Sequence, residues 1–158
     1  MNYFKIFGAI LILLCSTTLA IILCANEDKK HKRLCAYIDL LRYIKVQIDC
    51  YCATLEEIMR RCDGGLLAEC GCTVPVSDFS SLLRESDMCL DEKAVQLLYN
   101  FENEIGKGYK SSQIAVCDYY VNELCQLRDK SAAKLPSSKK VCAAVCICVG
   151  IMIIIILV

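Results

Sequence analysis

The fold is decided by residues 34–52, LCAYIDLLRYIKVQIDCYC. Within this stretch apolar residues recur at spacings of three and four, at Leu34, Ile38, Leu41, Ile44 and Ile48. That spacing places them on one stripe of an α-helix, and the charged residues between them fall off the stripe. The stretch therefore predicts an amphipathic helix that ends near Ala53 and buries one face in a core.

The residues that follow predict two short helices. Thr54 and Glu57 in ATLEE fit a capping box, so a helix is expected over 55–62, and the glycines of DGG (63–65) should end it. Residues 64–77 hold three glycines and Pro75, and are expected to be irregular. A second short helix over 78–85 is expected to begin after a Ser77 cap.

Two longer helices complete the central part of the chain. The first is expected over 91–105, on the apolar stripe Ala94, Leu98, Phe101 and Ile105, with Gly106 and Gly108 ending it. The second carries Ile114, Cys117, Val121 and Leu124 at the same spacing, and Pro136 should end it. No convincing strand alternation is present, so the sequence predicts an all-α bundle of four or five antiparallel helices.

Both ends of the chain are apolar and free of charge. Residues 6–25 and 141–158 contain no charged side chain, while every acid and every base except Lys5 lies between them. As helices they would reach about 30 Å and about 27 Å, which suits the hydrocarbon core of a bilayer. We therefore expect transmembrane helices over 1–25 and 141–158 around a central domain over 26–140. The alternatives are a cleaved signal peptide for the first segment and a buried core helix for the second.

The basic residues next to these segments predict the orientation. Four follow the first segment closely and five precede the second: Lys29, Lys30, Lys32 and Arg33, then Arg128, Lys130, Lys134, Lys139 and Lys140. Because lysine and arginine accumulate on the cytoplasmic side of membrane spans, the central domain should face the cytoplasm and both termini the opposite side.

The cysteines are the most unusual feature of the composition. The 158 residues include 14 cysteines but one histidine and no tryptophan, and the net charge of zero gives no bias toward nucleic acid. The best metal candidate is CDGGLLAECGC (62–72), which brings Cys62, Cys70 and Cys72 to a glycine-rich stretch. Zinc sites prefer C-x2-C spacing, so we predict no metal or cofactor and expect reduced thiols that pack as small apolar side chains. A metal-binding membrane protein and a disulfide-rich extracytoplasmic domain remain as alternatives.

Catalytic motifs are absent from the sequence. EIGKGYKSS (104–112) lacks the spacing of a phosphate loop, and neither H-E-x-x-H nor G-x-S-x-G occurs. A turn between two helices explains residues 104–112 better. The chain is therefore predicted not to be an enzyme, and a bundle held by two membrane spans suggests a scaffold or docking platform.

Several stretches, taken in order, resemble one known family. The start FGAILILLCSTTLAIILCA, the helix start ATLEE, the corner LLYNFENEIGKGYKSSQ and the charge-free end with Gly150 resemble stage III sporulation protein AB of endospore-forming bacteria. At the corner, Ile105, Gly106 and Gln113 occupy the positions of a helix end, its glycine and the glutamine that opens the next helix. Leu124 and Ala132 continue that pattern.

The resemblance implies a fold and a role that periodicity alone does not. The fold would be similar to the cytoplasmic domain of the type II secretion inner-membrane platform protein F, a bundle of about six short helices. The protein would sit in the mother-cell membrane around the forespore, within a secretion-like complex. Its partners would be the secretion-type ATPase, other membrane subunits and the lipid bilayer. We expect partner contact at Gly106, Gly108 and Gln113, although ordinary helix-turn chemistry explains these residues equally well.

Overall fold

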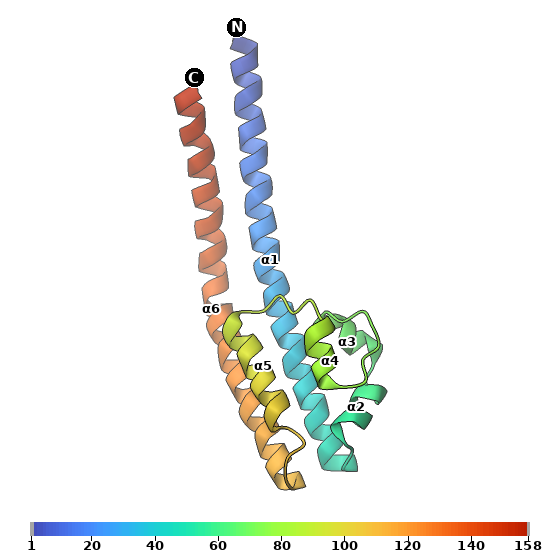
Figure 1. Cartoon of the computed structure of the whole chain (residues 1–158). Coiled ribbons are helices and arrows are strands. Elements are labelled where there is room, and N and C mark those ends of the chain that lie inside the picture. The colour runs from blue at the N-terminus through green and yellow to red at the C-terminus, as the bar shows by residue number, and fades with distance from the viewer. Residues whose placement is uncertain (1, 158) are drawn as a thin grey trace. The chain divides into compact units, whose positions relative to one another are not determined.

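The chain folds entirely into helices and the loops between them. A computed structural model (Figure 1) describes the backbone of residues 2–157, and the side chains of 8, 14, 15, 17–133, 144, 145, 148, 151 and 152. Residues 2–157 form six α-helices and no strand: α1 (Asn2–Tyr51), α2 (Leu55–Arg61), α3 (Gly64–Cys70), α4 (Phe79–Glu85), α5 (Glu92–Glu104) and α6 (Lys110–Leu157). The predicted all-α class is confirmed.

The chain divides into two compact units. One consists of residues 1–28 with 132–158, and the other of residues 29–131. Helices α1 and α6 each contribute to both units. Most side chains of the two predicted membrane segments lie outside the described residues. Among the residues that are described, no helix offers a stretch long and apolar enough to cross a membrane.

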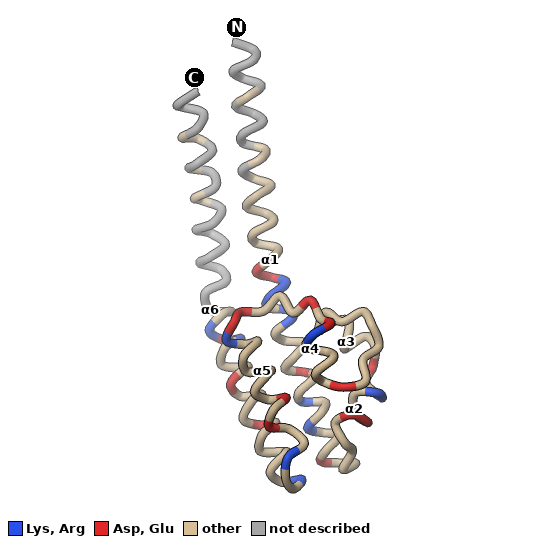
Figure 2. Tube along the Cα trace, in the orientation of Figure 1, with Lys and Arg blue, Asp and Glu red and all other residues tan. Residues whose placement is uncertain are grey.

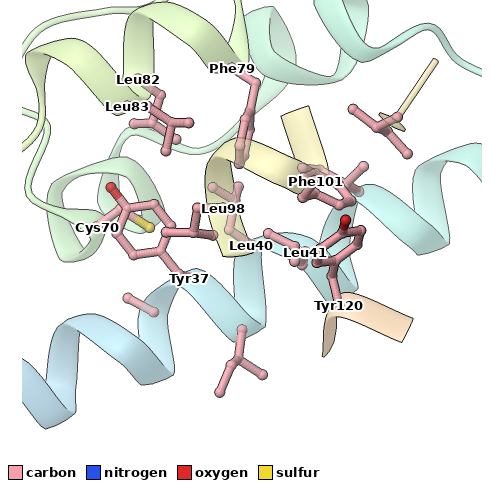
Figure 3. Packing of buried hydrophobic residues seen from close by; sticks show 14 of the residues in the cluster. Tyr37, Leu40, Leu41, Cys70, Phe79, Leu82, Leu83, Leu98, Phe101 and Tyr120 are labelled. Atoms are coloured by element: carbon pink, nitrogen blue, oxygen red, sulfur yellow. The ribbon is translucent and has the colours of Figure 1, made fainter. Parts of the chain in front are cut away.

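The core of unit 29–131 is built on the predicted stripe of α1. Each of its five apolar residues is at most 5% exposed, and Tyr37 and Leu40 join them in the core. Helix α5 adds Leu98 and Phe101. Figure 3 shows the aromatic contacts at the centre, where the Phe101 ring meets Phe79 edge-on at 5.3 Å and Tyr120 at 5.7 Å between ring centroids. The spacing of the apolar residues in the sequence thus predicted the buried face of this helix correctly.

Helix α3 was missed by the sequence prediction. Residues 64–70 form a helix where an irregular segment was expected, and the glycine that ends it is Gly71, with a left-handed φ of 98°. The guanidinium of Arg33 on α1 donates hydrogen bonds to the carbonyl oxygens of Ala68, at 2.7 Å, and of Glu69. A positive charge on the last carbonyls of a helix is favourable, so a residue about 35 positions away stabilises this short helix.

The predicted N-terminal cap of α2 is confirmed, whereas the one predicted for α4 is wrong. Thr54 caps α2, because its hydroxyl accepts from the Glu57 amide at 3.4 Å, which is one of the two hydrogen bonds of the predicted capping box; the Glu57 carboxylate pairs with Arg61. Helix α4 is capped by Asp78 and not by Ser77, through a 2.6 Å hydrogen bond from the Ser81 amide to the Asp78 carboxylate. That carboxylate accepts more strongly than a hydroxyl, and hydrogen bonds with the side chain and then the backbone amide of Ser81 lower the pKa of Asp78.

Each of the two long helices joins segments that were expected to be separate helices. Helix α1 has 50 residues without an interruption between the first apolar segment and the stripe, since NEDKKHKR (26–33) contains neither proline nor glycine. Helix α6 has 48 residues and passes through Pro136, so the predicted end at that residue is wrong. A proline removes one backbone hydrogen bond, and the turns on both sides of it keep the helix continuous.

Ion pairs connect the helices across the surface of unit 29–131, where acidic and basic residues are interspersed (Figure 2). Lys45 of α1 meets Asp118 of α6 at 2.6 Å, and Lys29 of α1 meets Asp87 in the α4–α5 loop at 2.6 Å. All four side chains are substantially exposed to solvent, so each pair adds less than about 1 kcal/mol to the stability of the fold.

Candidate partner interface

The corner between α5 and α6 is made by two glycines in left-handed conformations. Helix α5 ends at Ile105, whose side chain is buried, and the chain then turns at Gly106 (φ 81°) and Gly108 (φ 93°). Residues with a Cβ rarely adopt these angles, so both glycines are needed for the turn itself. A Cβ at Gly106 would meet no atom within 4 Å, which leaves open space above this residue.

Gln113 closes the same corner from the first turn of α6. Its side-chain amide donates to the carbonyl oxygen of Gly108 at 3.2 Å, and its backbone N–H donates to Tyr109 at 3.1 Å. The structure therefore brings Gly108 and Gln113 into contact, and Gly106 lies two residues before Gly108. Each of the three predicted residues has a role in shaping the corner, and contact with a partner stays a prediction.

Two exposed tyrosines lie beside this corner, and the sequence prediction did not include them. Tyr109 is 87% exposed and Tyr51, the last residue of α1, is 71% exposed. Figure 1 shows the end of α1 and the α5–α6 turn at the same end of the bundle. We call residues 50–52 together with residues 106–109 the tyrosine tip. Tyrosines belong among the residues enriched in protein interfaces, because one end of the ring is apolar and the other can hydrogen-bond.

Lys110 holds the two halves of the tyrosine tip together. Its ammonium lies 3.1 Å from the Asp49 carboxylate and also donates to the Asp49 backbone carbonyl, near the C-terminal end of α1. A cation is favoured at that end by the helix dipole, and the hydrogen bond with Asp49 raises the pKa of Lys110. The contact fixes the first turn of α6, and with it Tyr109, against the last turn of α1.

The end of α1 also presents two exposed thiols. Cys50 and Cys52 are both accessible to solvent, and Cys52 has a φ of 50°. Its amide donates to the carbonyl of Ile48 at 3.1 Å, which closes the last turn of the helix. These thiols are therefore suitable labelling sites on the tyrosine tip.

The metal candidate at Cys62, Cys70 and Cys72 is largely buried. Burial raises the pKa of the Cys70 thiol to about 12 and also raises the pKa of Cys62, while the Cys72 thiol lies 3.2 Å from the carbonyl of Val74. A thiol must lose its proton to bind a metal, so these environments favour neutral, apolar use of the sulfur. Among the described residues, no group of three or more histidine, cysteine or acidic side chains is placed to hold a metal ion, and no described cysteine forms a disulfide.

Comparison with known proteins gives one match. The model of the family described as stage III sporulation protein AB matches residues 77–158, just over half of the chain. No curated protein and no solved structure matches it. The matched region contains α4, α5 and α6, and therefore the Gly106–Tyr109 half of the tyrosine tip, whereas Tyr51 lies outside it.

Proposed function

Because the chain belongs to the stage III sporulation protein AB family, and hence has a sporulation-related role, we propose that it is a platform subunit. In this proposal it is a non-catalytic membrane component of the secretion-like complex between mother cell and forespore. Its central domain docks the secretion-type ATPase of that complex from the mother-cell cytoplasm. The tyrosine tip is the observation that carries the docking part of this proposal.

The membrane part of the proposal rests on the sequence and on helix length. The segments 6–25 and 141–158 are free of charge, and α1 and α6 continue far beyond the parts that belong to unit 29–131. Each helix is about 75 Å long at 1.5 Å per residue, which leaves more than enough length for a bilayer. We propose that these segments span the membrane around the forespore, with both termini opposite the central domain, and contact the other membrane subunits.

The docking part rests on the chemistry of the tyrosine tip. Tyr51 and Tyr109 are far more exposed than a large aromatic ring usually is, and the glycine corner and the Lys110–Asp49 contact hold them in place. Rigid, exposed tyrosines supply large contact areas with little loss of side-chain entropy on binding. A protein partner that covers both rings would gain most of its binding energy from these two residues.

The docking proposal is tested by purifying the tagged full-length chain from sporulating cells and measuring how much ATPase remains bound. We expect Tyr51→Ala with Tyr109→Ala to reduce the bound ATPase by about tenfold or more, because loss of a hot-spot residue costs about 2 kcal/mol. Tyr119→Ala is the matched control, since Tyr119 is 57% exposed but lies on α6 away from the corner. Equal retention of the ATPase by the double variant and the control would refute docking at this tip.

The orientation is tested with a membrane-impermeant maleimide on intact and lysed cells. Cys50 and Cys52 are exposed in unit 29–131, so they should react only after lysis if that unit is cytoplasmic. Reaction in intact cells would place the unit outside and favour the alternative of an extracytoplasmic domain. The other alternative, a cysteine-based metal protein, predicts that the purified chain carries bound metal, and metal analysis of the purified chain tests this.

A further inference from the structure

A hollow of about 440 Å³ lies between α2, α3 and the segment that follows α3. Its floor is apolar and consists of buried side chains: Met59, Leu67, Cys72 and Val76. The rim is formed by more exposed residues: Arg60, Gly64, Ala68, Thr73, Val74 and Pro75. Its volume falls within the range of about 300–1,000 Å³ that is usual for ligand sites.

The rim carries one cation without a counter-ion. The neighbouring Arg61 pairs with Glu57 at 2.7 Å, whereas Arg60 makes no ion pair with any described residue. Val74, on the same rim, is 50% exposed although it is a large apolar residue. An apolar hollow beside an unpaired guanidinium is complementary to an apolar side chain that has a carboxylate next to it.

The backbone along the rim also lacks partners within the described part of the chain. The amide of Cys72 donates to Leu67, and the next backbone hydrogen bond beyond it joins Leu82 to the carbonyl of Asp78. Between them, over residues 73–77, the one hydrogen bond is the thiol contact to the carbonyl of Val74. Pro75 has no N–H and Val76 is buried, but Thr73, Val74 and Ser77 are exposed, so their N–H groups are available to the main chain of a peptide that lies along the segment.

We propose that this hollow binds an extended segment of a partner protein in which a large apolar residue lies next to an acidic one. The apolar side chain enters the hollow over Met59 and Leu67, the carboxylate pairs with Arg60, and the peptide main chain hydrogen-bonds to residues 73–77. The hollow shares no residue with the tyrosine tip, so this inference stands independently of the proposed docking of an ATPase.

The test uses two synthetic fluorescent peptides, GTLEVTG and its charge-reversed control GTLKVTG, with the full-length chain in detergent micelles. Binding is followed by fluorescence anisotropy. We expect saturable binding of the glutamate peptide below about 1 mM and binding of the lysine peptide about tenfold weaker. Arg60→Glu should reverse this preference, and Arg61→Glu, which changes the same charge outside the hollow, should leave it unchanged.

A second variant is designed to obstruct the hollow. Gly64 lines the hollow and a Cβ there would meet no atom within 4 Å, so Gly64→Phe adds a large side chain at its edge without a clash at the Cβ. It should abolish binding of the glutamate peptide while the melting temperature of the chain stays unchanged. If this variant fails to fold, Val74→Asp takes its place, because it puts a negative charge on the rim at an exposed position.

Three outcomes would overturn the proposal. The first is equal binding of both peptides that persists in Gly64→Phe, which would indicate partition into the micelle. The second is the absence of saturable binding up to about 1 mM. The third is a change of the oligomeric state in Gly64→Phe, measured by analytical ultracentrifugation, with no effect on peptide binding, which would show that a second copy of the chain occupies the hollow.

Discussion

Arg33→Met should release helix α3 while the rest of the bundle stays folded. The guanidinium donates to two carbonyl oxygens at the C-terminal end of this seven-residue helix, which is too short to be stable alone. A hydrogen bond from a charged group to a neutral one contributes about 1.5–3 kcal/mol. Because Arg33 is partly exposed, we expect the local opening of α3 to become easier by about 2 kcal/mol in total.

The opening can be measured through thiols that the fold protects. Cys70 on α3 and Cys117 on α6 are both 0% exposed, so each reacts with a maleimide only when its surroundings open. A change of about 2 kcal/mol should accelerate labelling of Cys70 about thirtyfold, since each 1.4 kcal/mol is a factor of ten. Labelling of Cys117 should keep its original rate, and mass spectrometry of the two peptides separates the rates.

Lys29→Met is the matched control for this experiment. It also removes a cation from α1, but the Lys29 ion pair with Asp87 is between side chains that are 46% and 67% exposed. Such a pair contributes less than about 1 kcal/mol, so the labelling rate of Cys70 should rise by no more than about fivefold. Equal acceleration of Cys70 and Cys117 in Arg33→Met would mean global destabilisation, and an unchanged Cys70 rate would mean that Arg33 does not hold α3. Either result refutes the reasoning.

Three further predictions concern stability. Phe101→Ala should lower the free energy of unfolding by about 4 kcal/mol in urea titrations, because the ring is 0% exposed and touches two other rings; a loss below about 1 kcal/mol would contradict this. Burial raises the pKa of Tyr37 from 10.0 to about 12. The contribution of the neutral Tyr37 side chain to the free energy of unfolding is therefore fully present below pH 10 and is lost as the pH rises toward 12. Tyr37→Phe should reduce the loss of stability between those pH values, and an unchanged alkaline profile would argue against this assignment. Gly108→Ala should cost about 1 kcal/mol in thermal melts because of its φ of 93°, whereas Gly64→Ala, where a Cβ meets no atom within 4 Å, should cost nothing; equal losses would refute the distinction.

The parts of the fold that the sequence predicted are those governed by local rules. The stripe on α1 and the one on α5 are both buried as their spacing indicated, and Thr54 caps α2 as its position before Glu57 indicated. Helix α3 escaped prediction because two glycines at its start suggested a loop, while the group that stabilises its end belongs to α1. A contact between residues about 35 positions apart leaves no local signal in the sequence.

The candidate interface shows the same division. Gly106 and Gly108 predicted a turn between two helices, and the structure has a turn at these residues. The exposure of Tyr51 and Tyr109 could not be foreseen, because it depends on which residues of α1 and α6 end side by side. The contact that joins these two helix ends, between Lys110 and Asp49, links residues that are 61 positions apart. Spacing alone describes one helix at a time and cannot give the register between two.

The basic residues that predict orientation also help to hold the fold, and this decides how orientation should be tested. Lys29 pairs with Asp87, and Lys30 lies 3.6 Å from Asp91. Together with Arg33, they attach α1 to α3 and to the α4–α5 loop. Replacing all the basic residues of 29–33 would therefore change both the charge near the membrane and the stability of the bundle. A protein inserted in the wrong orientation could then not be distinguished from a misfolded one.

Lys32 and Lys130 provide the cleaner experiment, because both are exposed and neither forms an ion pair with a described residue. Lys32→Gln with Lys130→Gln should leave the melting temperature unchanged, while removing two of the charges that favour a cytoplasmic location. If lysine and arginine govern orientation, part of the population should then show Cys50 and Cys52 reacting with an impermeant maleimide in intact cells. A fully protected population would mean that these two charges do not influence the orientation of the chain.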